Sequence, residues 1–530
     1  MDKRAQTPQA LDAPHLQPGP GSDSGPCHQP APQGGKILGL GSIFFKSIGH
    51  FWPGLNDWAD QLPDTRWQWL VTYEARFLLW WGLLLFCFKL GSRRDLDYKL
   101  RDLELCVLAN LNQLAQTQQS TLPVHKTLDH FLGHVGSAAL ADLRNRCVRR
   151  LIRNKVLDRF RFDAQFVIAT DGTGYLVFKE RHCPHCLEHS NGSSLYYLHP
   201  VLEAKIVHSS GLAISIGTEF IENPLSERPQ PTSAKLTDYE AVKQDCELKA
   251  FLRLAPQLKA AYPQTPFCLA TDSLMACGPV LRVCQEYGWS YVLTFKPGRT
   301  PALWADFQGL LKLHPQNRLT VLLPERKTRQ SFRWVNDLQY VDSDKRAHIV
   351  HALICQESLE GQAQTYSWIT NKRLSAANVA SVATQAGRVR FKIENQGFNI
   401  QKNSGLNLEH AYSLGEDTLK CFYYLLQIAH LFLQMLERGS LLRSWHGSTT
   451  PRPLGCLAAS RISPSFSWIV FVTCNWRRRL LSPPKPSRSA YSIHPERALQ
   501  AGSSFWTAEH LRKTTFARWR RLFPQKNSSP

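Results

Sequence analysis

The chain has 530 residues, and its 63 lysines and arginines outnumber its 42 acidic residues, which gives a formal net charge of +21 at pH 7. A positive excess of this size attracts phosphates and favours a nucleic acid as partner. The 14 cysteines have no regular spacing, which argues against a disulfide framework and for mostly reduced thiols. The length is sufficient for two or three domains with a large core.

The first part of the chain divides into a polar leader and a helical region. Residues 1–35 are rich in Pro, Gln and Gly, which predicts a disordered leader without the features of a secretory signal. Residues 36–160 have helical patterns and predict an α-helical domain. The apolar run Phe77–Phe88 is shorter than the roughly 20 residues that a membrane-spanning helix needs, so we expect a buried core helix and no membrane.

Basic residues recur at helical spacing just before the first predicted strand. This pattern predicts an amphipathic helix with a basic outer face, which is either a solvated surface or a DNA contact. Two of its members, Arg149 and Arg153, are candidate phosphate contacts. The full set is Arg144, Arg146, Arg149, Arg150, Arg153 and Lys155.

From residue 161 onward the pattern becomes that of an α/β fold. Short apolar and β-branched runs predict strands, and longer patterns predict helices near 243–258 and 275–288. We expect Gly172 and Gly174 to permit a tight turn and a close backbone approach, and we expect a β-rich insertion at about 297–371. The expected strands are 166–170, 174–179, 195–207, 211–219, 267–271, 290–295, 319–323, 332–341, 349–354 and 366–370.

Three carboxylates stand at informative places in this pattern. Asp171 and Asp272 each follow a short buried strand, and Glu394 lies on a helix-like stretch beside Arg388 and Arg390. Oxygen ligands suit Mg²⁺, and a metal pair about 3.5–4 Å apart can stabilise the attacking and leaving oxygens of a phosphodiester. The spacing alone does not show that the three converge, because an aspartate after a strand is often a turn or helix-cap residue.

Two further groups have local interpretations. Asp245 and Glu247 are simplest as acids in the first turn of a helix, where the helix dipole favours them. Cys183 and Cys186 have the two-residue spacing that lets both thiolates reach one Zn²⁺. The other ligands would come from a nearby His or from a distant residue such as Cys246, and the alternative is an ordinary β-hairpin with two thiols.

Several segments together resemble the DDE transposases of bacterial insertion sequences, over about Phe44 to Arg438. The resemblance implies an RNase H-like mixed sheet flanked by helices within residues 161–438, with a helical domain before it that helps to bind DNA. The segments begin at Asp171 (Asp-Gly-Thr-Gly-Tyr), His182 (His-Cys-Pro-His-Cys), Lys243 (Lys-Gln-Asp-Cys-Glu), Trp368 (Trp-Ile-Thr-Asn) and Gly387 (Gly-Arg-Val-Arg-Phe-Lys-Ile-Glu-Asn).

The same resemblance implies the chemistry. Asp171, Asp272 and Glu394 would bind two Mg²⁺ or Mn²⁺ ions, and the reaction would be DNA strand cleavage followed by strand transfer. The partners would be double-stranded DNA, as element ends and target, and a second copy of the chain in a homodimer on DNA. The location would be the cytoplasm of a bacterium, at the nucleoid.

A related branch of these enzymes carries a Tyr, Arg, Glu and Lys signature around the glutamate. Arg390 and Glu394 fit it, which makes Arg390, with Arg388 beside it, a candidate phosphate contact. Gly387 stands at the Tyr position and Gln401 at the Lys position. On an ideal α-helix Gln401 shares a face with Glu394, whereas Lys402 points away from it.

Residues 439–530 are rich in Ser, Pro, Arg and Trp, which fits a basic DNA-binding tail and equally a frameshifted reading of an original tail. Two alternative functions also stay open. One is an RNase H-like nuclease that cuts without strand transfer. The other is a decayed or domesticated DNA-binding protein that binds DNA and does not cut it.

Overall fold

The computed structural model describes residues 34–100, 104–191, 194–223, 245–323, 328–359 and 362–440, all of which belong to one compact unit. The expected leader therefore lies outside the described residues, except that Gly34 and Gly35 begin a helix. The expected tail also lies outside them beyond residue 440.

Between residues 36 and 160 the described chain is helical and contains no strand. The apolar run Phe77–Phe88 forms α3 and its C-terminal cap, and every one of its side chains is buried, as expected. The helices are α1 (Gly34–Phe51), α2 (Leu55–Asp60), α3 (Ala75–Cys87), α4 (Arg93–Leu100), α5 (Glu104–Ala115), α6 (His125–Val135) and α7 (Ser137–Arg153), with 3-10 turns η1 (Gln68–Leu70) and η3 (Asp158–Phe160).

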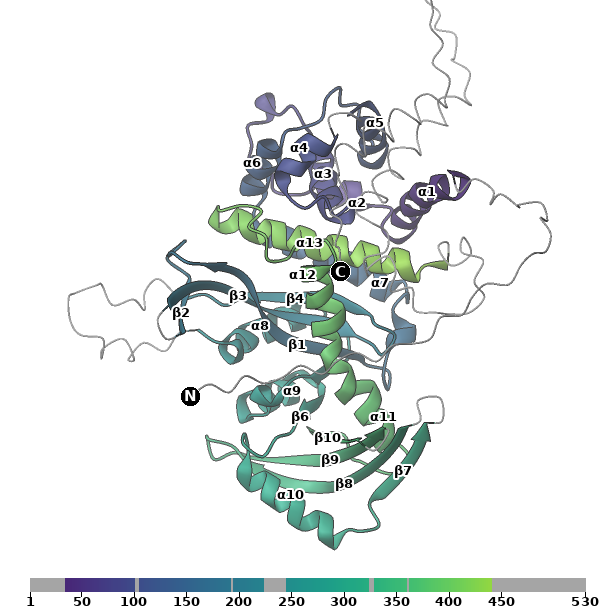
Figure 1. Cartoon of the computed structure of the whole chain (residues 1–530), viewed down its shortest axis with the longest axis vertical. Helices are drawn as coiled ribbons and strands as arrows, with labels where there is room; N and C mark the ends of the chain where they lie inside the picture. Colours follow the sequence, from purple (N-terminus) through teal and green to yellow (C-terminus); the bar gives the residue numbers. More distant parts are fainter. Residues whose placement is uncertain are drawn as a thin grey trace, which may run out of the picture. The chain divides into compact units, whose positions relative to one another are not determined.

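The rest of the described chain is built on one mixed sheet, so the expected α/β class with a sheet flanked by helices is confirmed (Figure 1). The strand order is β2-β3-β1-β5-β6-β10-β9-β8-β7, and β4 also pairs with β3. The strands are β1 (Phe166–Phe178), β2 (Leu187–Asn191), β3 (Ser194–Val207), β4 (Ala213–Phe220), β5 (Phe267–Ala270), β6 (Ser290–Thr294), β7 (Arg318–Leu323), β8 (Thr328–Val341), β9 (Ala347–Leu359) and β10 (Gln362–Thr370).

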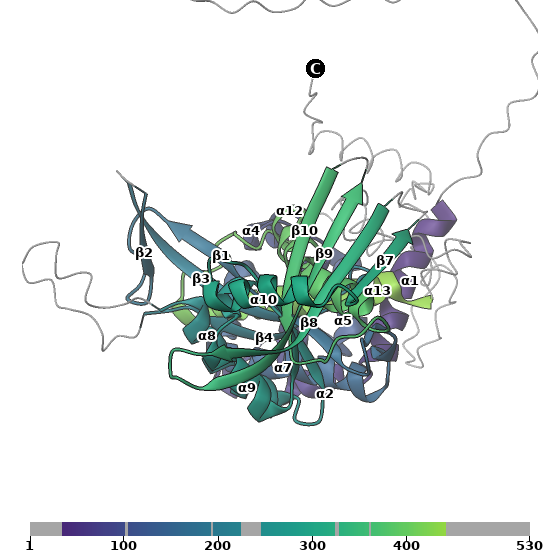
Figure 2. The same ribbon diagram turned by 90° about the horizontal axis from the view of Figure 1, so that it is seen from below.

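Pairing direction changes across this sheet. β3 is antiparallel to both β1 and β4, whereas β1, β5 and β6 are parallel neighbours. β10 then joins β6 in antiparallel register, with Trp368 opposite Thr294, so β7–β10 continue the same sheet (Figure 2). The strands of the expected insertion are therefore extensions of the central sheet.

The expected tight turn at Gly172 and Gly174 is wrong, whereas the expected close approach to the backbone does occur at Gly172. β1 runs through both glycines, which pair with Leu202 and Pro200 of β3, and a register shift follows between Gly174 and Leu176. Gly172 is needed for space, because a Cβ there would lie 2.0 Å from a carboxylate oxygen of Glu247. Gly172 therefore allows a close approach, and Gly174 stands next to a bulge in the same strand.

Helices cover both faces of the central strands. α8 (Glu247–Ala261) lies against β4, where Gly217 leaves room for Leu254 and Leu258. α9 (Gly278–Tyr287) connects β5 to β6 and ends at Gly288 in the left-handed conformation. α10 (Pro301–Leu313) lies on β8, where the Leu311 carbonyl accepts a hydrogen bond from Arg333 (Figure 2).

α13 (Glu416–Arg438) lies between the N-terminal helices and the sheet (Figure 1). On one side Phe432 packs on Trp52, and on the other Gln434 bonds to both backbone groups of Ala213 in β4. α13 is long and apolar enough to cross a membrane by length and composition, but 89% of its apolar stretch is buried in the fold. This burial is typical of a core helix.

The segment that carries Glu394 is helical, but it is not a regular α-helix. π-helical and 3-10 turns interrupt it. The directions expected for Gln401 and Lys402 relative to Glu394 assumed an ideal α-helix, so they do not apply directly. The turns are α11 (Val379–Ser381), π-helical η8 (Val382–Gly387), 3-10 η9 (Arg388–Phe391), π-helical η10 (Ile393–Phe398) and α12 (Asn399–Asn403).

α7 differs from the expected helix with a basic outer face. Arg144 is only 3% exposed and donates hydrogen bonds to Ser215 and Thr218 of β4, at 3.2 and 2.5 Å. Arg153, by contrast, is exposed at the end of the helix. Part of the basic pattern is therefore a buried polar link between α7 and the sheet, since a buried guanidinium must find partners.

This difference gives a matched test on one helix. We expect Arg144→Met to lower the free energy of unfolding by about 1–3 kcal/mol, because it leaves buried hydroxyls without their donor. Arg153→Met should change it by less than about 0.5 kcal/mol, as an exposed substitution does. Urea unfolding of both variants measures the two values, and equal effects would contradict the structural role of Arg144.

Candidate active site

The register of two parallel strands places the two predicted aspartates side by side. Ala169 of β1 is aligned with Ala270 of β5. Asp171 lies two residues after Ala169 within β1, and Asp272 lies two residues after Ala270, just beyond the end of β5. Neighbouring strands lie about 4.8 Å apart, so equivalent positions present adjacent side chains at one edge of the sheet. The sequence could not show this, because three other strands and a helix separate β1 from β5 along the chain.

Asp272 also acts as the helix cap that the sequence left as an alternative. Its Oδ1 accepts a hydrogen bond from the Leu274 amide at 3.0 Å, at the start of the 3-10 turn η6 (Ser273–Met275). This bond fixes the rotamer of the carboxylate at the sheet edge. The capping role and a ligand role are compatible, since a carboxylate has two oxygens and about four lone-pair sites.

Arg390 connects Glu394 to the aspartates. Its guanidinium lies 2.8 Å from Glu394 Oε1, one helical turn along the chain, and 3.7 Å from Asp171 Oδ2. Arg390 therefore joins Glu394 to Asp171, and Asp272 follows the neighbouring strand at the equivalent position, so the three predicted carboxylates belong to one region of the fold. In this structure the contacts of Arg390 are to carboxylates, as expected of a cation beside a cluster of negative charge.

A fourth carboxylate, Glu247, belongs to the same place. Its side chain lies over Gly172 at the N-terminus of α8, and its pKa is raised by burial and by the charge of Asp272. The position of Glu247 in the sequence predicted a first-turn acid, and the family resemblance left room for a role near the site. The signal that could have found it is the glycine directly after Asp171, which is the one residue type that leaves room for this carboxylate.

The cluster is short of positive charge. Burial raises the pKa of Asp171 to about 7, Arg390 opposes this, and the nearby carboxylates Glu394 and Glu247 raise it further. A carboxyl that keeps its proton near neutral pH marks a site where like charges crowd together. A bound cation would relieve that repulsion, and the all-oxygen donor set fits hard ions such as Mg²⁺ or Mn²⁺.

The other predicted contacts lie elsewhere. Arg388 pairs with Glu357 at 2.9 Å and stacks on Tyr366, so it faces β9 and β10. Arg149 pairs with Asp142 at 3.1 Å on α7. Neither side chain forms an ion pair with the four carboxylates of the candidate site.

The two positions after Glu394 are also resolved by their contacts. Gln401 is fully buried and bonds to Gln427 and His430 of α13. Lys402 pairs with Glu409 at 2.7 Å. Gln401 therefore supports the helix from within the core, and Lys402 is directed to an acid outside the cluster.

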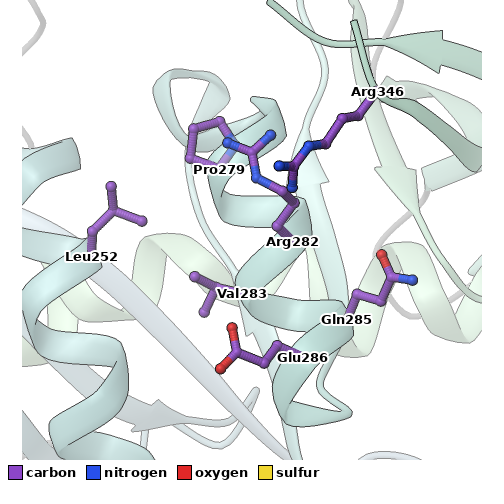
Figure 3. A pocket seen from close by; sticks show the side chains of 7 residues that line it. All are labelled: Leu252, Pro279, Arg282, Val283, Gln285, Glu286 and Arg346. Carbon is purple, nitrogen blue, oxygen red and sulfur yellow. The ribbon is translucent and has the colours of Figure 1, made fainter. Parts of the chain in front are cut away.

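A cysteine pair and a hollow lie apart from the four carboxylates. Cys183 and Cys186 lie before β2, with their sulfurs 3.6 Å apart. A hollow of about 640 Å³ lies beside α9, between Arg282 and Arg346 (Figure 3). None of the four carboxylates lines this hollow. The candidate active site is therefore the cluster of Asp171, Asp272, Glu394 and Glu247.

No known family model and no curated protein matches this chain. The functional case therefore depends on the residues that the fold brings together.

The raised pKa of Asp171 predicts a pH-dependent stability. Without metal, the folded protein holds a proton at Asp171 between about pH 4 and 7 that the unfolded chain releases, so the free energy of unfolding falls as pH rises through this window. We expect Asp171→Asn to remove up to about 1.4 kcal/mol of this fall per pH unit. Thermal unfolding in EDTA from pH 5 to 8 measures it.

Glu437 provides the control. Burial also raises its pKa to about 7, and it pairs with Arg438 at the end of α13. Glu437→Gln should therefore flatten the same pH profile, yet at pH 8 it should keep the stabilisation that added Mg²⁺ gives the wild type. Asp171→Asn should lose that stabilisation, and an equal Mg²⁺ response in both variants would contradict a metal site at Asp171.

Proposed function

We propose that this protein is a DDE transposase with an RNase H-like core, which cuts and joins DNA strands at the ends of its own element. The observation that carries the proposal is the convergence of Asp171, Asp272 and Glu394 from separate elements. The sheet order β4-β3-β1-β5-β6, antiparallel up to β1 and parallel from β1 to β6, supports such a core.

The donor set supports two divalent metals. Asp171, Asp272 and Glu394 would hold them, and Glu247 lies close enough to add its charge or a ligand oxygen. Bound there, Mg²⁺ or Mn²⁺ would supply charge stabilisation to the attacking and leaving oxygens of a phosphodiester. Asp171 lies on β1, and Asp272 follows the paired strand β5 and caps η6, which gives their oxygens the rigid placement that such chemistry requires.

The chain's own residues then have separate tasks. Asp171 must release its proton before it can bind a cation. Because its pKa is about 7, cation binding at Asp171 should strengthen as pH rises through neutrality. Arg390 forms ion pairs with Glu394 and Asp171, at 2.8 and 3.7 Å, while no other cation neutralises these carboxylates. Once those carboxylates are neutralised, its planar guanidinium can donate to a phosphate oxygen at the same edge.

DNA binding is supported by the charge of +21, which predicts affinity that falls steeply with salt. Arg153, exposed at the end of α7, and the partly exposed Arg149 and Arg388 remain proposed phosphate contacts. A homodimer would pair two element ends, and the enzyme would act at the bacterial nucleoid in the cytoplasm. The helical N-terminal region is proposed to help in end recognition.

The proposal is tested by strand cutting on a DNA fragment that carries the inverted repeats flanking the gene. With Mg²⁺ or Mn²⁺ we expect nicks at the repeat ends. Asp171→Asn, Asp272→Asn and Glu394→Gln should each reduce the rate by roughly 10²–10³-fold or more, the scale of losing one electrostatic partner in an active site. Glu409→Gln, which alters an exposed carboxylate paired with Lys402, is the matched control and should retain full cutting.

The products distinguish the remaining alternatives. Joined strands in a target plasmid support transposition, whereas nicks without joined products would identify an RNase H-like nuclease. DNA binding with a steep salt dependence and no cutting by the folded wild type would support a decayed or domesticated DNA-binding protein. Cutting that survives all three carboxylate substitutions would exclude the proposed site.

A further inference from the structure

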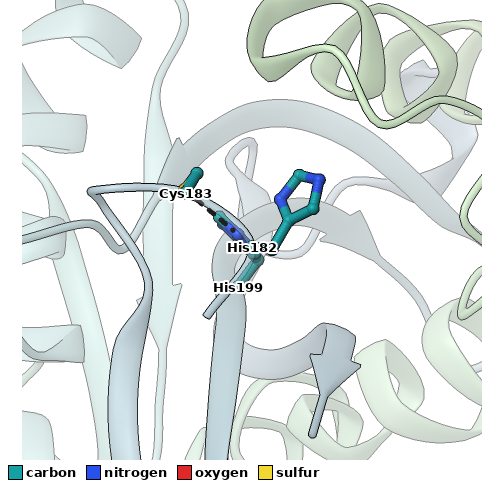
Figure 4. Close-up of side chains that lie close together, drawn as sticks. All are labelled: His182, Cys183 and His199. Carbon is teal, nitrogen blue, oxygen red and sulfur yellow. Dashed lines mark hydrogen bonds between the residues drawn. The ribbon is translucent and has the colours of Figure 1, made fainter. Parts of the chain in front are cut away.

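A second cluster of metal-type ligands lies at the root of the β2–β3 hairpin, apart from the carboxylates. The sulfurs of Cys183 and Cys186 lie 3.4 and 3.1 Å from Nε2 of His199, and 3.6 Å from each other. His182 completes the group, since its ligand atom lies within 4.8 Å of those of Cys183 and His199 (Figure 4). His199 reaches the group from β3, where it is paired with Leu176 of β1.

These distances are those of a tetrahedral zinc site. With Zn–S bonds of about 2.3 Å and Zn–N bonds of about 2.0–2.1 Å, tetrahedral ligands lie about 3.8 Å apart for two sulfurs and about 3.6 Å for sulfur and nitrogen. The three observed separations approach these values without any ion present. Cys186 is fully buried and His199 is 3% exposed, whereas His182 and Cys183 are partly exposed, so the site is enclosed on the side of β3.

Two observations on the surrounding atoms point to a bound cation. The buried Nδ1 of His182 has no hydrogen-bond partner among the described residues, although a buried polar nitrogen normally has one. Backbone amides also face the sulfurs, because His185 donates to Cys183 and Cys183 donates to Cys186, at 3.3 and 3.4 Å. Amide donors at sulfur favour the thiolate, which is the form that binds metal.

The neighbouring candidates are engaged elsewhere. His185 bonds through Nδ1 to the Asn223 carbonyl and through Nε2 to Glu416 of α13, at 3.0 and 2.9 Å. Cys246, which the sequence offered as a distant ligand, occupies the N-cap position of α8, whereas the sulfur and nitrogen contacts of the cluster join Cys183, Cys186 and His199. These contacts select among the ligand sets that the sequence left open.

We propose that His182, Cys183, Cys186 and His199 bind one structural Zn²⁺. Four protein ligands leave no open coordination position, so the ion has no catalytic role. It ties the connection after β1 to the base of the β2–β3 hairpin, where Leu187 and Leu198 form the first pair. Through His185 and Glu416 the same connection also contacts the start of α13.

Zinc content of the purified full chain, expressed without a histidine tag in Zn²⁺-supplemented medium, tests the site. We expect about one Zn²⁺ per chain in the wild type and in the controls Cys246→Ser and His185→Gln. Cys183→Ser, Cys186→Ser and His199→Gln should lose at least about nine-tenths of it. Zinc loss in Cys246→Ser with retention in His199→Gln would overturn the assignment.

Replacement by Co²⁺ keeps the proposal falsifiable if the variants fold poorly. Metal-free wild type titrated with Co²⁺ should show intense visible absorption of a tetrahedral site and thiolate charge-transfer bands, saturating at about one equivalent. Weak octahedral absorption, or a mass two daltons low from a Cys183–Cys186 disulfide in a zinc-free chain, would contradict it. Neither measurement depends on DNA cutting, so this site and the proposed function can fail independently.

Discussion

The parallel pairing of β1 with β5 is the constraint on which the candidate active site depends. Backbone hydrogen bonds align Ala169 with Ala270, and this register alone brings Asp171 next to Asp272. A slip of one residue would turn one of the two aspartates to the opposite face of the sheet. The fully buried residues of both strands make such a slip expensive, so the hydrophobic core fixes the geometry of the charged edge.

A buried network of hydrogen bonds holds the helical segment that carries Glu394. Lys205 of β3 bonds to Glu203 and to Gln427 of α13, and Gln427 bonds in turn to Gln401, which follows Glu394 on the same helical segment. Gly397, on the π-helical turn that carries Glu394, lies against the aliphatic part of Lys205. The network thus connects the glutamate segment to both the sheet and the central helix, and a fully satisfied buried network permits few alternative arrangements.

The sequence predicted the elements well where a short apolar run ended at a turn or a cap. The start of β1, the position of β5 before Asp272 and the burial of Phe77–Phe88 follow from hydrophobic pattern alone. It failed where one residue type has two physical uses. Gly172 was expected to permit a turn and a close approach, and only the close approach, by Glu247, occurs. Arg144 was expected on a basic outer face and is instead a buried donor to β4. Such contacts join distant segments, so no local pattern contains them.

The carboxylate group and the Cys and His group differ in how their negative charge is neutralised and in their exposure to solvent. The carboxylates lie at a partly open edge, where Arg390 offsets some of their repulsion and the pKa of Asp171 stays near 7. Such a site exchanges protons and cations readily, which suits ions that must meet a substrate phosphate. The Cys and His ligands instead lie at the closed root of a hairpin, with amide donors facing the sulfurs. An ion held there would be shielded from solvent, so its binding energy would stabilise the folded hairpin rather than act on a substrate.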